Sequence, residues 1–263
     1  MDVLWYDGAF VPHGDHGQPR VPIVDPGYLL GDGVFATMRG YRGVCFRAAV
    51  HLADLARGAE LFGIELPPHP LAALANEAAA RTGAGDANVR ITLTRGSRLS
   101  ILARPMDVPA PDDYVRGASA TIITRRAACI EPRVKTTSYA PALLARREAA
   151  PREAIQLGAS GELACGAMAN LFVVVRDALL TPHLASGCRD GVTRRAVLEL
   201  APRVGLAPRE ERLEPSILAE ADEAFLTSTR IECLPLARVG DTTLRRGDRA
   251  GALRDLLRAE ALR

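Results

Sequence analysis

The alternation of apolar and polar residues along the chain predicts strands and amphipathic helices in both halves. Residues 88–94 alternate with period two, which is typical of a half-buried strand. The apolar positions of residues 51–62 recur with helical spacing, and Gly63 follows at a position where helices commonly end. The same criteria predict strands at 3–11 (a hairpin around Asp7-Gly8), 119–124, 170–175 and 223–229, and helices at 70–82, 140–150, from Thr193 to about Pro202, and around 253–257. Both halves are therefore expected to mix α and β structure.

Residues 104–113 are the best candidate for a linker, because they contain three prolines and three aspartates. We place a domain boundary near residue 113. The prediction is a smaller N-terminal domain over residues 1–113 and a larger C-terminal domain over residues 114–263.

The composition indicates a globular protein whose partner is a small molecule. The chain has 263 residues, of which 48% are hydrophobic, and 33 basic against 31 acidic side chains give a formal charge of +2. This balance gives no electrostatic case for binding nucleic acid or a membrane surface. No run approaches the roughly 18 apolar residues of a membrane span, and the start lacks the pattern of a secretion signal. We expect a soluble, cytoplasmic protein.

The cysteines and histidines do not indicate a structural disulfide framework or a metal site. The five cysteines form an odd set without a Cys-x-x-Cys pair, so neither disulfides nor zinc are expected. His13 and His16 lie close together, but glycine and proline surround them, as in a loop tip. No metal is predicted.

Lys135 is the only lysine in the chain, because the other 32 of the 33 basic residues are arginines. A guanidinium does not lose its proton near neutrality and cannot form an imine, whereas a primary amine can do both. Lys135 is therefore the candidate for imine chemistry. The alternative is that a coding bias favours arginine, alanine and glycine, and that one surface lysine remains by chance.

Eight short segments, in order along nearly the whole chain, resemble the class IV aminotransferase family. This family comprises the fold-type IV pyridoxal phosphate enzymes, among them branched-chain and D-amino-acid aminotransferases and 4-amino-4-deoxychorismate lyase. The resemblance implies an α+β protein with a small N-terminal α/β domain, a larger C-terminal domain with a barrel-like sheet, a cofactor site between them, and a homodimer. The segments are residues 31–35 (GDGVF), 51–55 (HLADL), 135–139 (KTTSY), 170–172 (NLF), 181–182 (TP), 191–194 (GVTR), 221–223 (ADE) and 226–229 (LTST).

The resemblance also implies roles for individual residues toward pyridoxal 5'-phosphate. Lys135 falls at the position of the Schiff-base lysine, and Tyr139 at a position that hydrogen-bonds the phenolic oxygen of the cofactor. Two segments match phosphate-binding positions, a helix start and a turn, where backbone N–H groups and hydroxyls suit a dianion. They are Gly191, Val192 and Thr193, and Ser228 and Thr229. Without the resemblance, both segments would be ordinary helix and turn caps.

Two positions depart from the family pattern. Cys165 stands where the family has a glutamate that keeps the pyridine nitrogen protonated, and Glu162 could replace that carboxylate only through a bulge. Asp54 stands where the family has an arginine that contacts the phosphate, which a carboxylate would repel. Arg57 is three residues further along the same helix and could contact the phosphate instead.

The substrate-binding residues are less clearly marked. Phe35 is followed by Ala-Thr, without the acidic residue that branched-chain enzymes carry, which favours the lyase slightly. Arg95, Arg98 and Arg104 are possible clamps for a substrate carboxylate, and each could equally be a solvated surface arginine.

Three functions follow from this pattern. The first is a pyridoxal phosphate-dependent aminotransferase that acts on a small amino acid and a keto acid. The second is the related lyase. The third is a degenerate homologue that keeps the fold but has impaired or no cofactor chemistry, as Asp54 and Cys165 would suggest.

Overall fold

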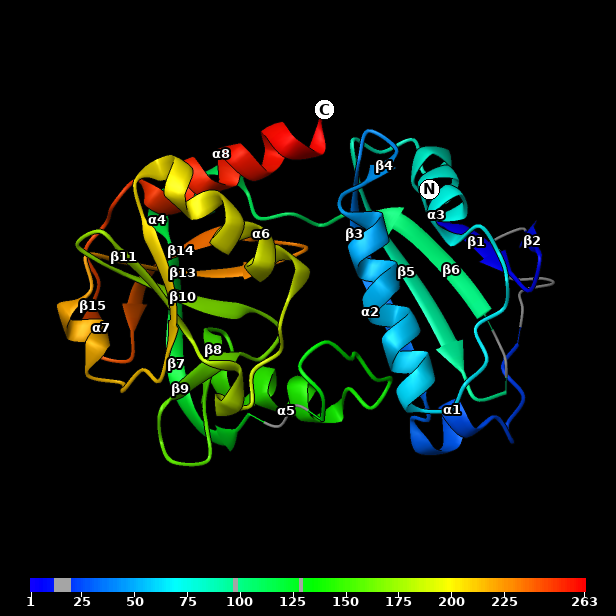
Figure 1. Cartoon of the computed structure of the whole chain (residues 1–263), viewed down its shortest axis with the longest axis horizontal. Helices are drawn as coiled ribbons and strands as arrows, with labels where there is room; N and C mark the ends of the chain where they lie inside the picture. Colours follow the sequence, from blue (N-terminus) through cyan, green and yellow to red (C-terminus); the bar gives the residue numbers. More distant parts are fainter. Residues whose placement is uncertain (12–19, 97–98, 128–129) are drawn as a thin grey trace. The chain divides into compact units, whose positions relative to one another are not determined.

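The computed structural model of the chain describes residues 1–11, 20–96, 99–127 and 130–263, and it divides into two compact units (Figure 1). Unit 1 comprises Met1–Asp107 together with the short segment Arg133–Tyr139. Unit 2 comprises Val108–Pro132 and Ala140–Ala261. The chain therefore leaves unit 1, enters unit 2, and returns to unit 1 for the segment that carries Lys135.

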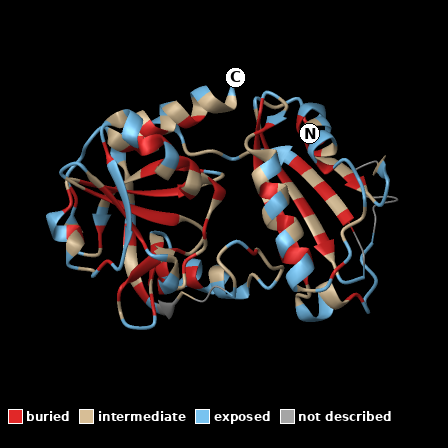
Figure 2. Ribbon diagram, viewed as in Figure 1, coloured by how far each residue is buried: buried red, intermediate tan, exposed pale blue. Residues whose placement is uncertain are grey.

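Unit 1 is a six-stranded antiparallel sheet with the strand order β2-β1-β6-β5-β3-β4. Its strands are β1 (Val3–Tyr6), β2 (Ala9–Val11), β3 (Gly33–Tyr41), β4 (Val44–Cys45), β5 (Asp86–Thr94) and β6 (Leu99–Pro105). Its helices are α1 (Pro26–Leu30), α2 (Ala48–Leu61) and α3 (Leu71–Arg81). The period-two pattern is confirmed in β5, where every second residue is buried (Figure 2).

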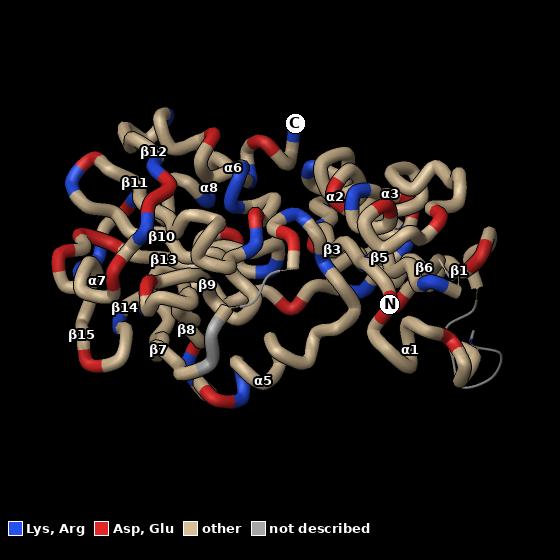
Figure 3. Tube along the Cα trace, turned by 60° about the horizontal axis from the view of Figure 1, so that its bottom comes forward, with Lys and Arg blue, Asp and Glu red and all other residues tan. Residues whose placement is uncertain are grey.

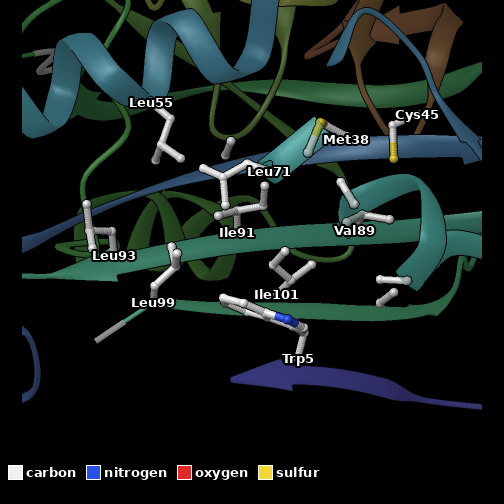
Figure 4. Packing of buried hydrophobic residues seen from close by; sticks show 14 of the residues in the cluster. Trp5, Met38, Cys45, Leu55, Leu71, Val89, Ile91, Leu93, Leu99 and Ile101 are labelled. Atoms are coloured by element: carbon white, nitrogen blue, oxygen red, sulfur yellow. The ribbon is translucent and has the colours of Figure 1, made fainter. Parts of the chain in front are cut away.

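The core of unit 1 lies between one face of this sheet and the helices α2 and α3. Leu55 from α2 and Leu71 from α3 pack against Met38, Val89 and Ile91 of the central strands (Figure 4). Side chains alternate across a strand, so the residues between these apolar ones project from the other face of the sheet. That second face carries the polar residues of the site described below.

Unit 2 contains a closed six-stranded barrel that three further strands, β11, β12 and β15, extend. The strands β10, β13, β14, β7, β8 and β9 pair in this order, and β9 pairs again with β10. Apolar residues from all six strands form one cluster, which fills the barrel. The strands are β7 (Ala118–Arg126), β8 (Glu153–Leu157), β9 (Leu163–Gly166), β10 (Asn170–Val175), β11 (Ala178–Pro182), β12 (Ala207–Glu211), β13 (Glu223–Ser228), β14 (Glu232–Val239) and β15 (Thr242–Thr243).

Helices lie around this barrel. They are α4 (Pro111–Arg116), α5 (Ala140–Ala149), α6 (Val192–Leu200), α7 (Ile217–Glu220) and α8 (Arg249–Ala261), with short 3-10 helices at Leu184–Ser186 and Ala201–Val204. The helices α6 and α8 pack against β13, where the rings of Phe172 and Phe225 stack at 5.2 Å. The expected α+β class with a barrel-like sheet is confirmed.

Two details of the organisation differ from the domains expected from the sequence. The units divide at Asp107 instead of residue 113, because residues 111–116 form α4, which packs against β14. The segment Arg133–Tyr139 belongs to unit 1, although the sequence placed Lys135 in the larger domain. Its backbone hydrogen bonds with β3 are long-range in sequence, and no local pattern reports them.

Charged residues are distributed over both units. Basic and acidic positions are interspersed along the trace in Figure 3, in keeping with the near balance of 33 and 31. No helix in the described part of the chain is long and apolar enough to cross a membrane.

The start of α8 depends on a carboxylate from β13, which gives a test of this part of the fold. Glu223 is 2% exposed, and its two carboxylate oxygens accept hydrogen bonds from the N–H groups of Arg249 (3.0 Å) and Ala250 (2.9 Å). Burial raises the pKa of this carboxyl. We expect Glu223→Ala to lower the free energy of unfolding by about 3 kcal/mol, because two buried donors lose their acceptor. Urea denaturation measures this loss.

The neighbouring Asp222→Ala variant is the matched control, because Asp222 is half exposed and also accepts a backbone N–H, from Arg176. It should cost clearly less than Glu223→Ala. Equal losses in the two variants would show that the buried cap does not anchor α8.

Candidate functional site

Backbone hydrogen bonds fix Lys135 beside β3. The N–H of Phe35 donates to the carbonyl of Lys135 at 2.9 Å, and the N–H of Thr137 donates to Gly33 at 2.9 Å. An antiparallel bridge joins Val34 to Thr136 between them. The lysine segment therefore lies against β3 as a short additional strand, and its backbone position follows from that pairing.

The ring of Phe35 contacts two other predicted site residues, Lys135 and Tyr139, and one further arginine, Arg90. This ring is buried, with 3% exposure. The Lys135 Nζ lies 4.8 Å from the ring centroid, the Arg90 Cζ lies 3.6 Å from it, and the Tyr139 ring packs edge-on at 5.4 Å. Two cations thus contact one aromatic ring, which is electrostatically favourable for each of them. We call Phe35, Arg90, Lys135 and Tyr139 the Phe35 cluster.

Arg90 is the site residue that sequence reasoning missed. Its Nε donates to Thr92 Oγ1 at 3.1 Å, and across the described residues no carboxylate pairs with its guanidinium. Burial lowers the pKa of Arg90, although Tyr139 partly offsets this effect. A desolvated guanidinium without an acidic partner is a candidate for binding an anionic ligand. The pairing of residues 33–41 with 86–94 sets Arg90 opposite Thr37, which places it diagonally across from Phe35.

The arginines proposed from the sequence as clamps have other contacts. Arg95 pairs with Asp32 and donates to the carbonyl of Phe62 at 2.6 Å, so it ties the end of β5 to the end of α2. Arg104 pairs with Asp2 at 2.8 Å. Arg98 lies outside the described residues. Arg90 is therefore a better candidate for a carboxylate clamp than Arg95 or Arg104.

The helix α2 carries the two residues that were considered for phosphate contact. Asp54 is half-buried and Arg57 is exposed, and they lie three residues apart in the middle of the helix. Arg57 as a phosphate ligand remains a prediction.

In unit 2, the N-terminus of α6 has the features of an anion site. Gly191 is the N-cap residue, with no side chain to accept the first N–H groups, which belong to Val192 and Thr193. A Cβ at Gly191 would collide with Asn170 Oδ1, so a larger residue would not fit. The Asn170 side chain is held in turn by its hydrogen bond to the carbonyl of Arg189, at 2.6 Å. A helix start of this kind suits a phosphate group.

Buried ion pairs fix the loop that leads into α6. Asp190 is 3% exposed, and its carboxylate pairs with Arg194 at 3.1 Å and with Arg195 at 3.2 Å. Its N–H donates to the carbonyl of Pro132 at 2.7 Å. Pro132 immediately precedes the lysine segment. Asp190 therefore fixes both the start of α6 and the backbone just before the lysine segment.

The turn after β13 offers hydroxyl groups. Ser228 Oγ accepts a hydrogen bond from the N–H of Ile231 at 3.4 Å and keeps its own hydrogen for donation. The hydroxyl of Thr227 is buried without a partner among the described residues, and Thr227 lies opposite Asn170 in the sheet. Together with the start of α6, these donors fit a phosphate dianion, so unit 2 suits the phosphate of pyridoxal phosphate.

Cys165 lies in β9, opposite Asn170 on one side and Gln156 on the other. The register of β8 and β9 shifts next to it, so the bulge that Glu162 required is present. However, the Glu162 carboxylate accepts the N–H of Ser160 at 3.1 Å, and its own backbone hydrogen bond is the main cause of its lowered pKa. Glu162 therefore caps its own turn and does not replace the carboxylate missing at Cys165.

No group of three or more metal-ligating side chains clusters in the part of the chain that the structure describes. The close pair His13 and His16 lies outside that part. Among the described residues, no disulfide joins Cys45, Cys165, Cys188 or Cys233.

Comparison with known proteins gives the family. Residues 33–239 match the amino-transferase class IV family. The chain is 28% identical over 254 residues to a Methanocaldococcus jannaschii protein assigned as a branched-chain-amino-acid aminotransferase, covering 90% of this chain and 87% of the relative. It is 29% identical over 257 residues to the aminodeoxychorismate lyase of Bacillus subtilis, covering 90% and 88%.

A solved structure agrees with these matches. The branched-chain aminotransferase of Thermoproteus uzoniensis, crystallised with norvaline, superposes with a TM-score of 0.87 at 27% identity and covers 99% of this chain and 94% of that chain. The predicted resemblance is thus confirmed over most of the sequence. The chain belongs to the class IV aminotransferase family of pyridoxal phosphate-dependent enzymes.

Proposed function

We propose that this enzyme transfers an amino group between a small amino acid and a keto acid, with Lys135 as its catalytic residue. The observation that supports the proposal most strongly is that the only lysine of the chain is the one in the Phe35 cluster. Bound pyridoxal phosphate supplies the electron sink that stabilises negative charge at the substrate α-carbon. Lys135 would hold the cofactor through its amine, and the same amine would accept and return the α-proton of the substrate.

The phosphate-binding residues follow from the donors in unit 2. The N–H groups of Val192 and Thr193 at the start of α6, and the hydroxyls of Ser228 and Thr229, would bind the phosphate. Gly191 allows the backbone to approach it closely. Tyr139 and Arg57 are proposed as further cofactor contacts, to the phenolic oxygen and to the phosphate, as the family resemblance suggests.

Arg90 is proposed to bind the carboxylate of the substrate. It lies on the same ring as Lys135, and its fork of N–H donors matches a carboxylate. Phe35 holds both cations in place and adds an apolar surface. The substrate is therefore an amino acid or keto acid whose carboxylate forms an ion pair with Arg90.

The lyase is the second candidate function, favoured by the 29% identity to an aminodeoxychorismate lyase. An aminotransferase requires a keto acid to complete its cycle, whereas a lyase does not. The requirement for an added keto acid distinguishes the two. The third possibility, a degenerate homologue, rests on Asp54 and Cys165, and the intact donor set of unit 2 speaks against it.

We propose a second copy of this chain as the protein partner. Unit 1 exposes six large apolar side chains along and just before α1, with exposures between 56% and 76%. Such a patch is unusual on a monomer and indicates an interface. Its members are Val21, Ile23, Val24, Tyr28, Leu29 and Leu30. We also propose a cytoplasmic location, with which the absence of a disulfide between the described cysteines is compatible.

The first prediction concerns Lys135. Adding pyridoxal phosphate to the protein should produce an absorption band in the near-visible range that changes when an amino acid is added. Lys135→Arg keeps the positive charge but cannot form a covalent bond with the cofactor aldehyde. The variant should therefore lack the absorption band, and its kcat should fall at least about 100-fold. A variant that retains both would show that another amine carries the chemistry.

The second prediction concerns Arg90. Replacing it with glutamine should raise KM for the amino acid by roughly 10- to 100-fold, because a charged hydrogen bond to the carboxylate is lost. Arg104→Gln is the matched control, since Arg104 is a strand arginine of the same sheet that pairs with Asp2. Steady-state kinetics measure both. Equal KM values for the two variants would contradict the role of Arg90.

The third prediction concerns the apolar segment. Sedimentation should show a dimer for the unmodified protein and a monomer for Leu30→Glu, because a buried charge would oppose the interface. Val115→Glu is the control, because Val115 is 70% exposed but lies on α4, in unit 2. A dimer that survives Leu30→Glu but not Val115→Glu would place the interface elsewhere.

A further inference from the structure

The turn between β13 and β14 contains a glutamate in an unusual backbone conformation. Glu232, which begins β14, has a φ of 50°, in the left-handed region that favours glycine. Its side chain is also buried, with 2% exposure. A residue with a side chain persists in this conformation only where its surroundings hold it there, and such positions concentrate at functional sites.

Arg258 on α8 holds this glutamate. Its Nε donates to both carboxylate oxygens, at 2.9 and 3.0 Å, and its Nη2 donates to Oε2 at 2.7 Å. This two-pronged contact fixes the orientation of the carboxylate as well as its position. The conformation of Glu232 is thereby coupled to the last helix of the chain.

The same turn has two further internal contacts. The hydroxyl of Tyr114 donates to the carbonyl of Ile231 at 3.2 Å, and the N–H of Ile231 donates to Ser228 Oγ. Arg254, one helical turn before Arg258, lies 4.3 Å from the centre of the Tyr114 ring. The helix α8 therefore contacts both Glu232, through Arg258, and Tyr114, through Arg254; Tyr114 in turn hydrogen-bonds Ile231.

We propose that Arg258 is a positioning residue that holds the Ser228–Glu232 turn in the shape needed to bind the cofactor phosphate. The inference rests on the proposed function, which assigns phosphate contacts to Ser228 and Thr229. Ser228 lies directly opposite Glu232 in the hairpin, so the left-handed conformation at Glu232 determines how the chain closes back on Ser228. Arg258 acts on the phosphate only through this turn.

The test compares pyridoxal phosphate with pyridoxal, which lacks the phosphate, as ligands of the full chain freed of cofactor. Titration followed by absorbance gives a dissociation constant for each compound. Arg258→Gln should weaken pyridoxal phosphate about tenfold and pyridoxal less than twofold. Arg238→Gln, which removes an exposed arginine paired with Asp241 at the other end of β14, should change neither.

A second variant covers the case in which Arg258→Gln destabilises the fold by removing a charged partner of the buried Glu232 carboxylate. Adding Glu232→Gly removes that carboxylate, and glycine adopts the left-handed conformation without support. The double variant should bind pyridoxal phosphate within about threefold of the unmodified protein.

Two results would overturn the inference. If the unmodified protein prefers pyridoxal phosphate and Arg258→Gln leaves that preference unchanged, the positioning role of Arg258 is refuted while the proposed phosphate site stands. If the unmodified protein binds both compounds equally, the proposed phosphate site is refuted, and so is the positioning role of Arg258.

Discussion

The pairing of the lysine segment with β3 is the interaction on which the proposed chemistry depends. A lysine side chain has four flexible carbons, so its amine is placed reproducibly only if its backbone is fixed. The hydrogen bonds from Phe35 to Lys135 and from Thr137 to Gly33 provide that fixation. The ring of Phe35 also contacts Arg90 and the Lys135 amine. One strand residue therefore fixes the backbone of the lysine and brings a guanidinium close to its amine.

Buried charges play a corresponding part in unit 2. Asp190 pairs with Arg194, and both are buried; the buried Glu232 pairs with Arg258, whose side chain is 40% exposed. Such pairs contribute little net stability compared with apolar residues. Here each arginine fixes the orientation of a buried carboxylate. Each pair here lies beside a segment with phosphate-binding donors. The stability of the unit comes from the apolar barrel interior, and the ion pairs define the backbone geometry at its rim.

Local pattern predicted the elements well and their long-range partners poorly. The alternation over 88–94 and the helical spacing over 51–62 correspond to β5 and α2. The single lysine was visible in the sequence, but its partnership with β3 spans about 100 residues, and local periodicity carries no such information. Arg90 was missed for the same reason: it looks like any polar residue of a half-buried strand until its diagonal contact with Phe35 on β3 is known.

The central claim is that Lys135 is the residue that bonds to the cofactor, and the chain offers a clean measurement because it has no other lysine. Reduction of the pyridoxal phosphate-loaded protein with borohydride, followed by proteolysis and mass spectrometry, locates the trapped adduct. The account predicts that the adduct lies on the peptide containing Lys135. An adduct confined to the amino terminus at Met1, or no adduct at all, would contradict it.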